Sequence, residues 1–470
     1  MTLLFKILAT SALLLPAGLT WGNQTTDLSP ILSEASLPFT LQIDVADISL
    51  PTGIQSFVSA TRKGKWLFFA GRANGLHGFS NVGNNFPPAL QNTTAYVIDP
   101  VTGKSWSKSL NDGGLSQAEI DSLSVTASQF FQKGKMLYVV GGYGINTETG
   151  EMETKSTLTA IQVDKMMKWV MNDGTSSVKS AIRQVSDPLL QVTGGELFQA
   201  NDHQPMLLMV GQNFTGLYTT SSNGKYTMQI RPFYLCEGEK ELGILAKPST
   251  TIHSDYRRRD LNIVPVIKNN EFAYEIFGGV FTLDTGVWTV PITVFPDGSS
   301  TEPDPISPDT FKQGMNHYNC PNFGLYSGQS KEMFAVLPGG ISFGYFSGGV
   351  FTTDFEIPFT NQITTIKIDQ ENKYTQHLMN NEYPVIASTG SNPGNQLLFG
   401  AEAVFIPKDG IPLYGNSVIQ LDALPKTPTV IGYIVGGIMS TLQNTNFITD
   451  STASPYVFTV TLIPKEPVLP

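Results

Sequence analysis

The stretch VTASQFFQKGKMLYVVGG, residues 125–142, has the pattern that decides the fold. It combines a strand, a Lys-Gly turn and a second strand that ends in two glycines. Two more segments with strand-like composition follow it, STLTAIQVD at 156–164 and MKWVMND at 167–173. The sequence therefore predicts a four-stranded antiparallel sheet as the structural unit.

The apolar strand that ends in glycine recurs along the chain. The first four of these glycines are 70, 70 and 67 residues apart, and the later intervals are 61 and 97 residues. A nearly constant period of this size, with strands as its content, is typical of sheets arranged radially around an axis. The recurring glycines are Gly71, Gly141, Gly211, Gly278, Gly339 and Gly436.

Composition supports an all-β protein and limits its partners. The 470 residues include 44 glycines and 30 prolines, only 14% of them are charged, and the net charge is −10. Nucleic-acid binding needs a basic face, which this composition does not favour. No segment after the N-terminal leader is long and apolar enough to span a membrane. The oligomeric state does not follow from the sequence.

The repeat resembles the kelch-repeat β-propeller family. In that family a glycine pair ends the second strand of each blade, and a tyrosine and a tryptophan follow at set distances. Here the pattern includes Gly141, Gly142 and Trp169, and a weaker copy has Tyr96 and Trp106 after Gly71. The resemblance covers almost all of residues 40–465 and implies a propeller similar to exported bacterial kelch-like proteins, most of which have no established activity.

Six glycine anchors predict six four-stranded blades. The 97-residue interval before Gly436 leaves seven blades as the alternative, although its sequence also fits one blade with a proline-rich insertion between the first two strands. The segment LPFTLQIDVADI, residues 37–48, belongs to no blade of its own. We expect this N-terminal strand to pair with YVFTVTLIP, residues 456–464, and so to close the ring and cover an open sheet edge.

The N-terminus has the features of a signal peptide. One lysine precedes an apolar run from Ile7 to Leu15, and a proline and small residues follow. This predicts a signal peptide at 1–22, a linker at 23–39 and the propeller at 40–470. The mature protein is then periplasmic, extracellular or on the cell surface. In such an oxidising compartment Cys236 and Cys320 form either a disulfide or two buried free thiols.

Antiparallel geometry predicts which loops meet. Since strand direction alternates, residues before the first strand and residues after the glycines of the second strand lie on the same face of every blade. Three of the five histidines and four of the seven arginines fall in these positions. The candidate ligand-binding residues on this face are Arg72, Asn74, His77, Tyr143, Gln212, Asn213, His253, Asp255, Tyr256, Arg257, Arg258, Arg259, Asp260, Asn316, His317 and Tyr318.

These residue types suit polar recognition. Arginine presents donors that match carboxylates, and asparagine, tyrosine and histidine at a concave surface suit ligands with many hydroxyl groups. The competing interpretation is that the Arg257–Arg259 triplet bonds to nearby carbonyls and ties neighbouring blades together. For Asp255 and Asp260 a turn role is favoured, and for His77 and His317 a structural hydrogen-bonding role.

The sequence predicts no cofactor and no metal site, since no nucleophile elbow, phosphate-binding loop or metal motif is present. The leading hypothesis is a polar carbohydrate, with the arginines suited to an anionic one, or a protein partner bound on this face. Two relatives of the fold suggest enzymes instead, a sugar epimerase or an oxidase similar to galactose oxidase. For the oxidase, His317, Tyr318 and Cys320 lie close together in the sequence, but no second motif completes a copper site of that kind. A scaffold without catalytic activity is the third hypothesis.

Overall fold

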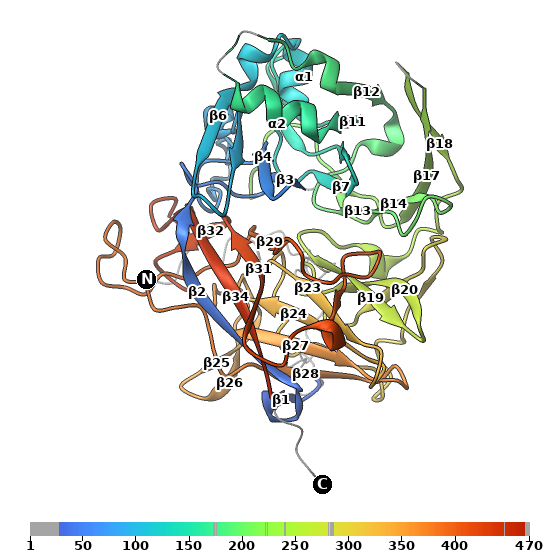
Figure 1. The fold of residues 1–470 in the computed structure, drawn as a ribbon, viewed down its shortest axis with the longest axis vertical. Helices are drawn as coiled ribbons and strands as arrows, with labels where there is room; N and C mark the ends of the chain where they lie inside the picture. The colour runs from blue at the N-terminus through green and yellow to red at the C-terminus, as the bar shows by residue number, and fades with distance from the viewer. Residues whose placement is uncertain are drawn as a thin grey trace, which may run out of the picture.

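The computed structural model describes residues 28–465, apart from residues 173, 175, 221, 223, 239, 240, 281, 283–285 and 446. The predicted signal peptide at 1–22 lies outside the described residues. The described part is an all-β propeller with few helices (Figure 1).

Five of the sheets around the propeller axis have four strands each, in antiparallel order. Sheet 1 contains β3 (Val58–Arg62), β4 (Lys65–Phe69), β5 (Thr94–Ile98) and β6 (Ser105–Ser109), and sheet 2 contains β7 (Gln129–Lys133), β8 (Met136–Val140), β11 (Thr157–Gln162) and β12 (Ile182–Ser186). Sheet 3 contains β13 (Glu196–Phe198), β14 (Met206–Met209), β17 (Ile230–Glu237) and β18 (Leu242–Ala246), and sheet 4 contains β19 (Asn262–Lys268), β20 (Glu271–Phe277), β21 (Ile292–Val294) and β22 (Ser300–Thr301). Sheet 6 contains β29 (Val404–Pro407), β31 (Thr429–Val435), β34 (Tyr456–Pro464) and β2 (Phe39–Ser49).

Sheet 5 departs from the predicted four-strand plan because it has six strands. Its central strands are β23 (Phe323–Ser327), β24 (Glu332–Pro338), β27 (Ile363–Ile368) and β28 (Tyr374–Leu378). β1 (Ile31–Ser33), from the segment predicted as a linker, pairs in parallel with β28. β30 (Ile419–Gln420) pairs in parallel with β23. The structure thus has five four-stranded blades, and the predicted count of six is wrong, because the edges of sheet 5 recruit strands from distant segments.

The long interval before Gly436 holds an insertion within sheet 6. Residues 408–428 separate the first two strands of that sheet, β29 and β31, and contribute β30 to sheet 5. Within the described residues this interval contains no additional four-stranded sheet. The interpretation of a proline-rich insertion is therefore correct.

The ring closes as predicted through the N-terminal strand. β2 pairs antiparallel with β34 from Phe39 opposite Pro464 onward, and the two strands run side by side in Figure 1, one blue and one red. Phe39, Leu41 and Ile43 point into the core and are at most 4% exposed. The N-terminal strand therefore contributes both ladder hydrogen bonds and apolar burial to sheet 6.

Each pair of neighbouring sheets shares a buried apolar cluster. Such clusters join sheets 1 and 2, 2 and 3, 3 and 4, 4 and 5, and 5 and 6, and a further one joins sheet 6 to sheet 1. Burial of these faces is the main stabilising contribution. The sheets consequently form a closed ring around a central axis.

One predicted strand is wrong. Residues 167–173 were expected as the last strand of sheet 2, but α2 (Val163–Met171) occupies this segment, and β12 is the fourth strand. Met166, Met167, Trp169 and Val170 are all buried in the cluster between sheets 1 and 2. The spacing of Met166, Met167 and Val170 fits one face of a helix, so packing decides in favour of the helix.

The remaining elements lie in the loops. Four two-stranded sheets pair β9 (Tyr143–Asn146) with β10 (Glu151–Thr154), β15 (Gln212–Asn213) with β16 (Lys225–Tyr226), β25 (Gly344–Ser347) with β26 (Val350–Thr353), and β32 (Ile438–Ser440) with β33 (Ser451–Ala453). A second short helix is α1 (Gln117–Ser122), and the 3₁₀ segments are Glu34–Ser36, Pro88–Leu90, Leu110–Gly113, Lys179–Ala181, Pro188–Leu190, Ser254–Tyr256 and Leu421–Ala423. No helix in the described part of the chain is long and apolar enough to cross a membrane.

Candidate ligand-binding cavity

The two predicted sets of loop residues do meet on one face. A residue three positions before the first strand, or five positions before it in sheet 5, forms an antiparallel bridge with the residue that follows the glycines of the second strand. These bridges join Thr126 to Tyr143, Thr193 to Gln212, Arg259 to Val280, and Tyr318 to Ile341. The direction argument made from the sequence is therefore correct, and it places six segments around one end of the channel.

Two cavities lie along the propeller axis. We call the first, of about 130 Å³, the mouth cavity, because the loops after the glycines line it. The second, of about 270 Å³, is lined by the beginnings of the first strands, and we call it the inner cavity. Polar and charged residues of the mouth cavity are Ser56, His77, Thr126, Tyr143, Thr193, Gln212, Tyr218, Arg259, Asp260, Tyr318, Asn319 and Glu402.

Six residues line both cavities, and we call them the neck residues. They are Ser56, Ala127, Gly194, Asp260, Asn319 and Glu402, one before the first strand of each sheet. All six have positive φ, between 49° and 67°. Five of them carry a side chain, and such a backbone conformation is unfavourable for most of these residue types. The ring holds this conformation because the adjoining strands and bridges fix the backbone on both sides.

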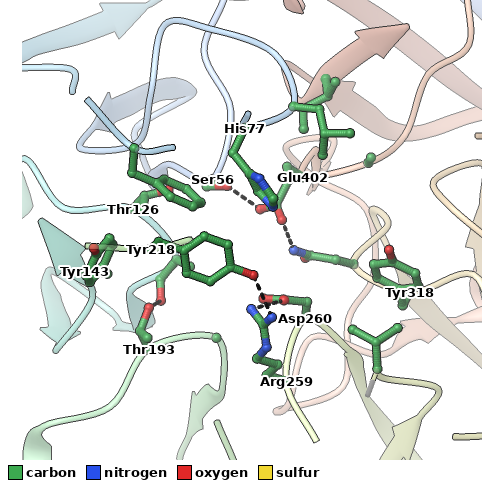
Figure 2. A pocket seen from close by; sticks show the side chains of 18 of the residues that line it. Ser56, His77, Thr126, Tyr143, Thr193, Tyr218, Arg259, Asp260, Tyr318 and Glu402 are labelled. Atoms are coloured by element: carbon green, nitrogen blue, oxygen red, sulfur yellow. Dashed lines mark hydrogen bonds and ion pairs between the residues drawn. The ribbon is translucent and has the colours of Figure 1, made fainter. Parts of the chain in front are cut away.

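Arg259 and Asp260 form the charged part of the mouth cavity. The Nη1 atom of Arg259 donates to the Asp260 carboxylate at 2.9 Å. Its Nη2 atom donates to the Tyr218 hydroxyl at 2.9 Å, and its Nε atom donates to the Tyr226 hydroxyl at 3.1 Å. Figure 2 shows Tyr218, Arg259 and Asp260 as one connected group on the cavity wall. The positive charge of Arg259 is thus balanced within the protein.

Glu402 is a second carboxyl group of the neck. Its side chain accepts a hydrogen bond from the Ser56 hydroxyl, as Figure 2 shows, and another from the Asn319 amide. Burial raises the pKa of Glu402 to about 7, and the nearby Asp260 adds to the rise. At neutral pH the protonated and the ionised forms of Glu402 are therefore both populated.

Aromatic rings form much of the remaining wall. The His77 ring lies 5.1 Å from that of Tyr218 and 5.0 Å from that of Phe86, measured between centroids. Its Nδ1 atom donates to the Gly78 carbonyl at 2.7 Å, which leaves Nε2 as a hydrogen-bond acceptor. Burial lowers the pKa of His77 to about 4, so the ring is neutral at pH 7. Figure 2 shows His77 among the cavity residues.

Arg257 and Arg258 do not line the mouth cavity. Arg258 is 1% exposed, and its guanidinium donates to the carbonyls of Asp255, Gly278 and Val290 at 2.7 to 3.2 Å. Burial lowers its pKa to about 9. Arg257 lies over the Tyr226 ring at 4.1 Å and donates to a backbone carbonyl. The interpretation of the triplet as an internal brace is thus correct for Arg258, and only Arg259 reaches the cavity.

Several other candidates are also used internally. Arg72, 1% exposed, donates to Asn74 and to the Pro87 carbonyl at 3.0 Å each. Asn213 donates to Gln191 at 3.0 Å. His317 is fully buried, and its Nδ1 atom lies 2.7 Å from the Gly339 carbonyl. The structural role favoured for His317 from the sequence agrees with these contacts, and its neighbour Asn316 bonds the loop at Ser342 and Phe343.

The segment before Arg257 faces away from the mouth cavity. The Nδ1 atom of His253 caps the following turn by accepting from the Asp255 backbone at 3.3 Å. Tyr256, 1% exposed, bonds to Ser300 and Glu302 at the outer edge of sheet 4. Of the sixteen candidate residues, those that line the mouth cavity are His77, Tyr143, Gln212, Arg259, Asp260 and Tyr318.

Sequence reasoning missed Glu402, Ser56 and Tyr218. A signal existed for the first two, since Ser56 and Glu402 occupy the same repeat position as Asp260, directly before the first strand of a sheet. Tyr218 lies in the longer loop between β15 and β16, and no repeat position marks it.

The two cysteines are far apart in the fold. Cys236 is exposed on β17 of sheet 3, whereas Cys320 is buried beside the inner cavity, and neither forms a disulfide. Of the two alternatives, the disulfide is therefore not formed, because Cys236 lies on the third strand of sheet 3 and Cys320 beside the channel. Cys320 agrees with the buried-thiol alternative and Cys236 does not. Within the described residues, no group of three or more His, Cys, Asp or Glu side chains is arranged to hold a metal ion.

Comparisons with known proteins identify no family. No family model matches the chain, and no curated protein matches it by sequence. The solved structure of YjhT resembles the chain with a TM-score of 0.44 and 11% sequence identity, over 88% of this chain and 98% of that one. The kelch-like classification thus stays a prediction.

Proposed function

We propose that the protein binds a small polyhydroxylated ligand, a carbohydrate, in the mouth cavity. The observation that carries this proposal is the combination of aromatic walls with a ring of hydroxyl, amide and carboxyl groups in one cavity. Aromatic rings cover the apolar faces of sugar rings, and planar polar side chains bond to their hydroxyl groups.

The charge balance favours a neutral sugar over an acidic one. Arg259 is the one arginine among the cavity-lining residues, and Asp260 already forms an ion pair with it. Glu402 adds a further acidic group to the wall. A ligand carboxylate would therefore meet at least as much negative as positive charge.

The test is a calorimetric titration with neutral and acidic monosaccharides. The wild type should bind at least one neutral sugar saturably, and Glu402→Gln and Tyr218→Phe should each weaken this binding by about tenfold. Glu271→Gln, at an exposed position on β20, and Tyr345→Phe, on β25, are matched controls outside both cavities. If no sugar binds, or if the control variants weaken binding as much as the cavity variants, the proposal is wrong.

A second candidate function is a sugar-modifying enzyme at the same site. The observation that favours it is the presence of two carboxyl groups in different surroundings in one cavity: burial raises the pKa of Glu402 to about 7, and Asp260 forms an ion pair with Arg259. Such a difference suits one group to donate a proton and the other to accept one. Incubation of a bound sugar with the protein, followed by NMR, separates a binder from an enzyme: a changed sugar spectrum with wild type and not with Glu402→Gln indicates turnover.

A further inference from the structure

The inner cavity differs in charge from the mouth cavity across the shared neck. The mouth cavity contains one cationic side chain, Arg259, beside Asp260 and Glu402. The residues that line the inner cavity include the carboxyl groups of Glu196, Asp260 and Glu402 and include no lysine, arginine or histidine. Its other titratable group is Cys320, a thiol whose pKa is raised by burial. A cation entering this cavity would meet no side chain of like charge.

Among the three carboxyl groups of the inner cavity, Glu196 differs in its contacts. It makes no side-chain hydrogen bond or ion pair within the part of the chain that the structure describes, in contrast to Asp260, held by Arg259, and Glu402, held by Ser56 and Asn319. Glu196 and Phe198 share one face of β13, while Leu197 between them is buried on the other face. A carboxyl group and a phenyl ring therefore face the cavity together.

Three half-buried phenyl rings recur at similar positions around the inner cavity. Phe130, Phe198 and Phe405 each lie three or four residues after a neck residue, within the first strands of sheets 2, 3 and 6. The faces of such rings attract cations, most strongly those with a diffuse charge and a weak hydration shell. The carboxyl groups of the described residues are not gathered into a set that could hold a metal ion. Their spread along the wall fits a larger cation with a diffuse charge.

From this geometry we propose that the inner cavity is a binding site for an organic cation, a quaternary or protonated amine, with Glu196 as its counter-ion and Phe130, Phe198 and Phe405 as its aromatic walls. The residues that define this site are separate from the sugar site, because neither Glu196 nor these phenylalanines lines the mouth cavity, although the two cavities share the neck residues.

The protonation of Glu196 supports this assignment. Burial raises its pKa to about 8, and the nearby Glu402 adds to the rise. Below about pH 8 the carboxyl group of Glu196 is therefore mostly protonated, and a cation that binds beside it would displace this proton. Cation binding should therefore release a proton from Glu196 below about pH 8 and weaken as the pH falls, with Glu402 and Asp260 as the other charged groups facing the site.

The experiment compares choline with its uncharged isostere 3,3-dimethylbutan-1-ol by calorimetry on the full chain. Choline does not titrate, so any pH dependence belongs to the protein. At pH 9 we expect choline to bind saturably and the alcohol to bind at least about tenfold more weakly. The affinity for choline should fall by up to about tenfold per unit between pH 8 and pH 6, with proton release detected in buffers of different ionisation enthalpy.

Glu196→Gln and Phe198→Leu test the two parts of the site, with Glu271→Gln as the matched control. Glu196→Gln should weaken choline binding at pH 9 by about tenfold or more and remove most of the proton release, while leaving sugar binding in the mouth cavity unchanged. Phe198→Leu should weaken it severalfold at every pH. Equal binding of the alcohol, choline binding that is indifferent to Glu196→Gln, no saturable binding, or binding of calcium chloride in place of choline would overturn the proposal.

Discussion

Arg259 and Asp260 are neighbours in sequence, and their side chains form an ion pair 2.9 Å long on the wall of the mouth cavity. Asp260 makes this contact from a backbone with a φ of 49°, as one of the six neck residues. The pair explains how an arginine can line the cavity without making it a strong anion site.

Asp260→Asn should change the ligand preference of the mouth cavity. Asparagine tolerates the left-handed backbone as well as aspartate does, so the variant should fold. Removal of the carboxylate leaves the charge of Arg259 without its counter-ion, and we expect the affinity for acidic sugars to rise by about tenfold relative to neutral ones. Calorimetric titration of wild type and variant with one acidic and one neutral sugar measures this change. An unchanged ratio of the two affinities would show that Asp260 does not control charge selectivity.

Arg258→Ala should destabilise the fold. The substitution leaves the carbonyls of Asp255, Gly278 and Val290 without their buried donor. We expect a loss of about 3 to 5 kcal/mol in the free energy of unfolding, measured by urea denaturation. Arg62→Ala is the control, because Arg62 makes a half-exposed ion pair with Asp164 and its loss should cost less than about 1 kcal/mol. Similar losses for both variants would contradict the role of Arg258 as a brace.

The contribution of Glu402 and Glu196 to the stability of the protein should fall as the pH rises from about 5 to about 9. The pKa values of Glu402 and Glu196 in the fold, about 7 and about 8, lie above that of a free glutamate, 4.5. The folded state therefore binds protons more strongly than the unfolded state in this range, and the slope of stability with pH from these two groups is negative. The contribution is fully present below pH 4.5 and is lost as the pH rises through 7 and 8.

The double variant Glu196→Gln/Glu402→Gln isolates this effect. Its melting temperature should exceed that of the wild type by a few degrees at pH 9 and match it near pH 4.5, as measured by differential scanning calorimetry. Because amides do not titrate, the variant should also show a flatter profile between these values. A parallel profile for wild type and variant would mean that neither carboxyl group has a raised pKa.

The two cysteines should react at very different rates. Cys236 is exposed, whereas Cys320 is 4% exposed and burial raises the pKa of its thiol. Ellman's reagent should therefore modify one thiol in the native protein and a second only after denaturation, without a reducing agent. Cys236→Ser should abolish the fast reaction. No reactive thiol in the denatured chain would indicate the disulfide that the structure lacks.

Repetition in the sequence was sufficient to predict most of the architecture. The glycines at Gly71, Gly141 and Gly211 mark a unit whose strand order is local, because adjacent antiparallel strands need only short turns. The same alternation of direction determined which loops share a face. Closure through β2 also followed, since residues 37–48 are strand-like and belong to no repeat.

The failures share one cause, which is contact between segments far apart in the chain. β30 joins β23 across a long interval, and α2 replaces a predicted strand because Met166, Met167 and Val170 pack between two sheets. Local composition contains neither contact.

The sequence by itself determined the radial array of sheets, the closing strand and the face on which Arg259, Asp260 and Tyr318 gather, because these depend on strand direction and a regular repeat. Only the tertiary structure decided that Arg258 braces the fold while Arg259 lines the cavity, and that Glu402 and Glu196 join the channel. Neighbouring residues of a loop point in different directions. Their roles depend on how deeply each is buried and on its hydrogen-bond partners, which come from distant parts of the chain.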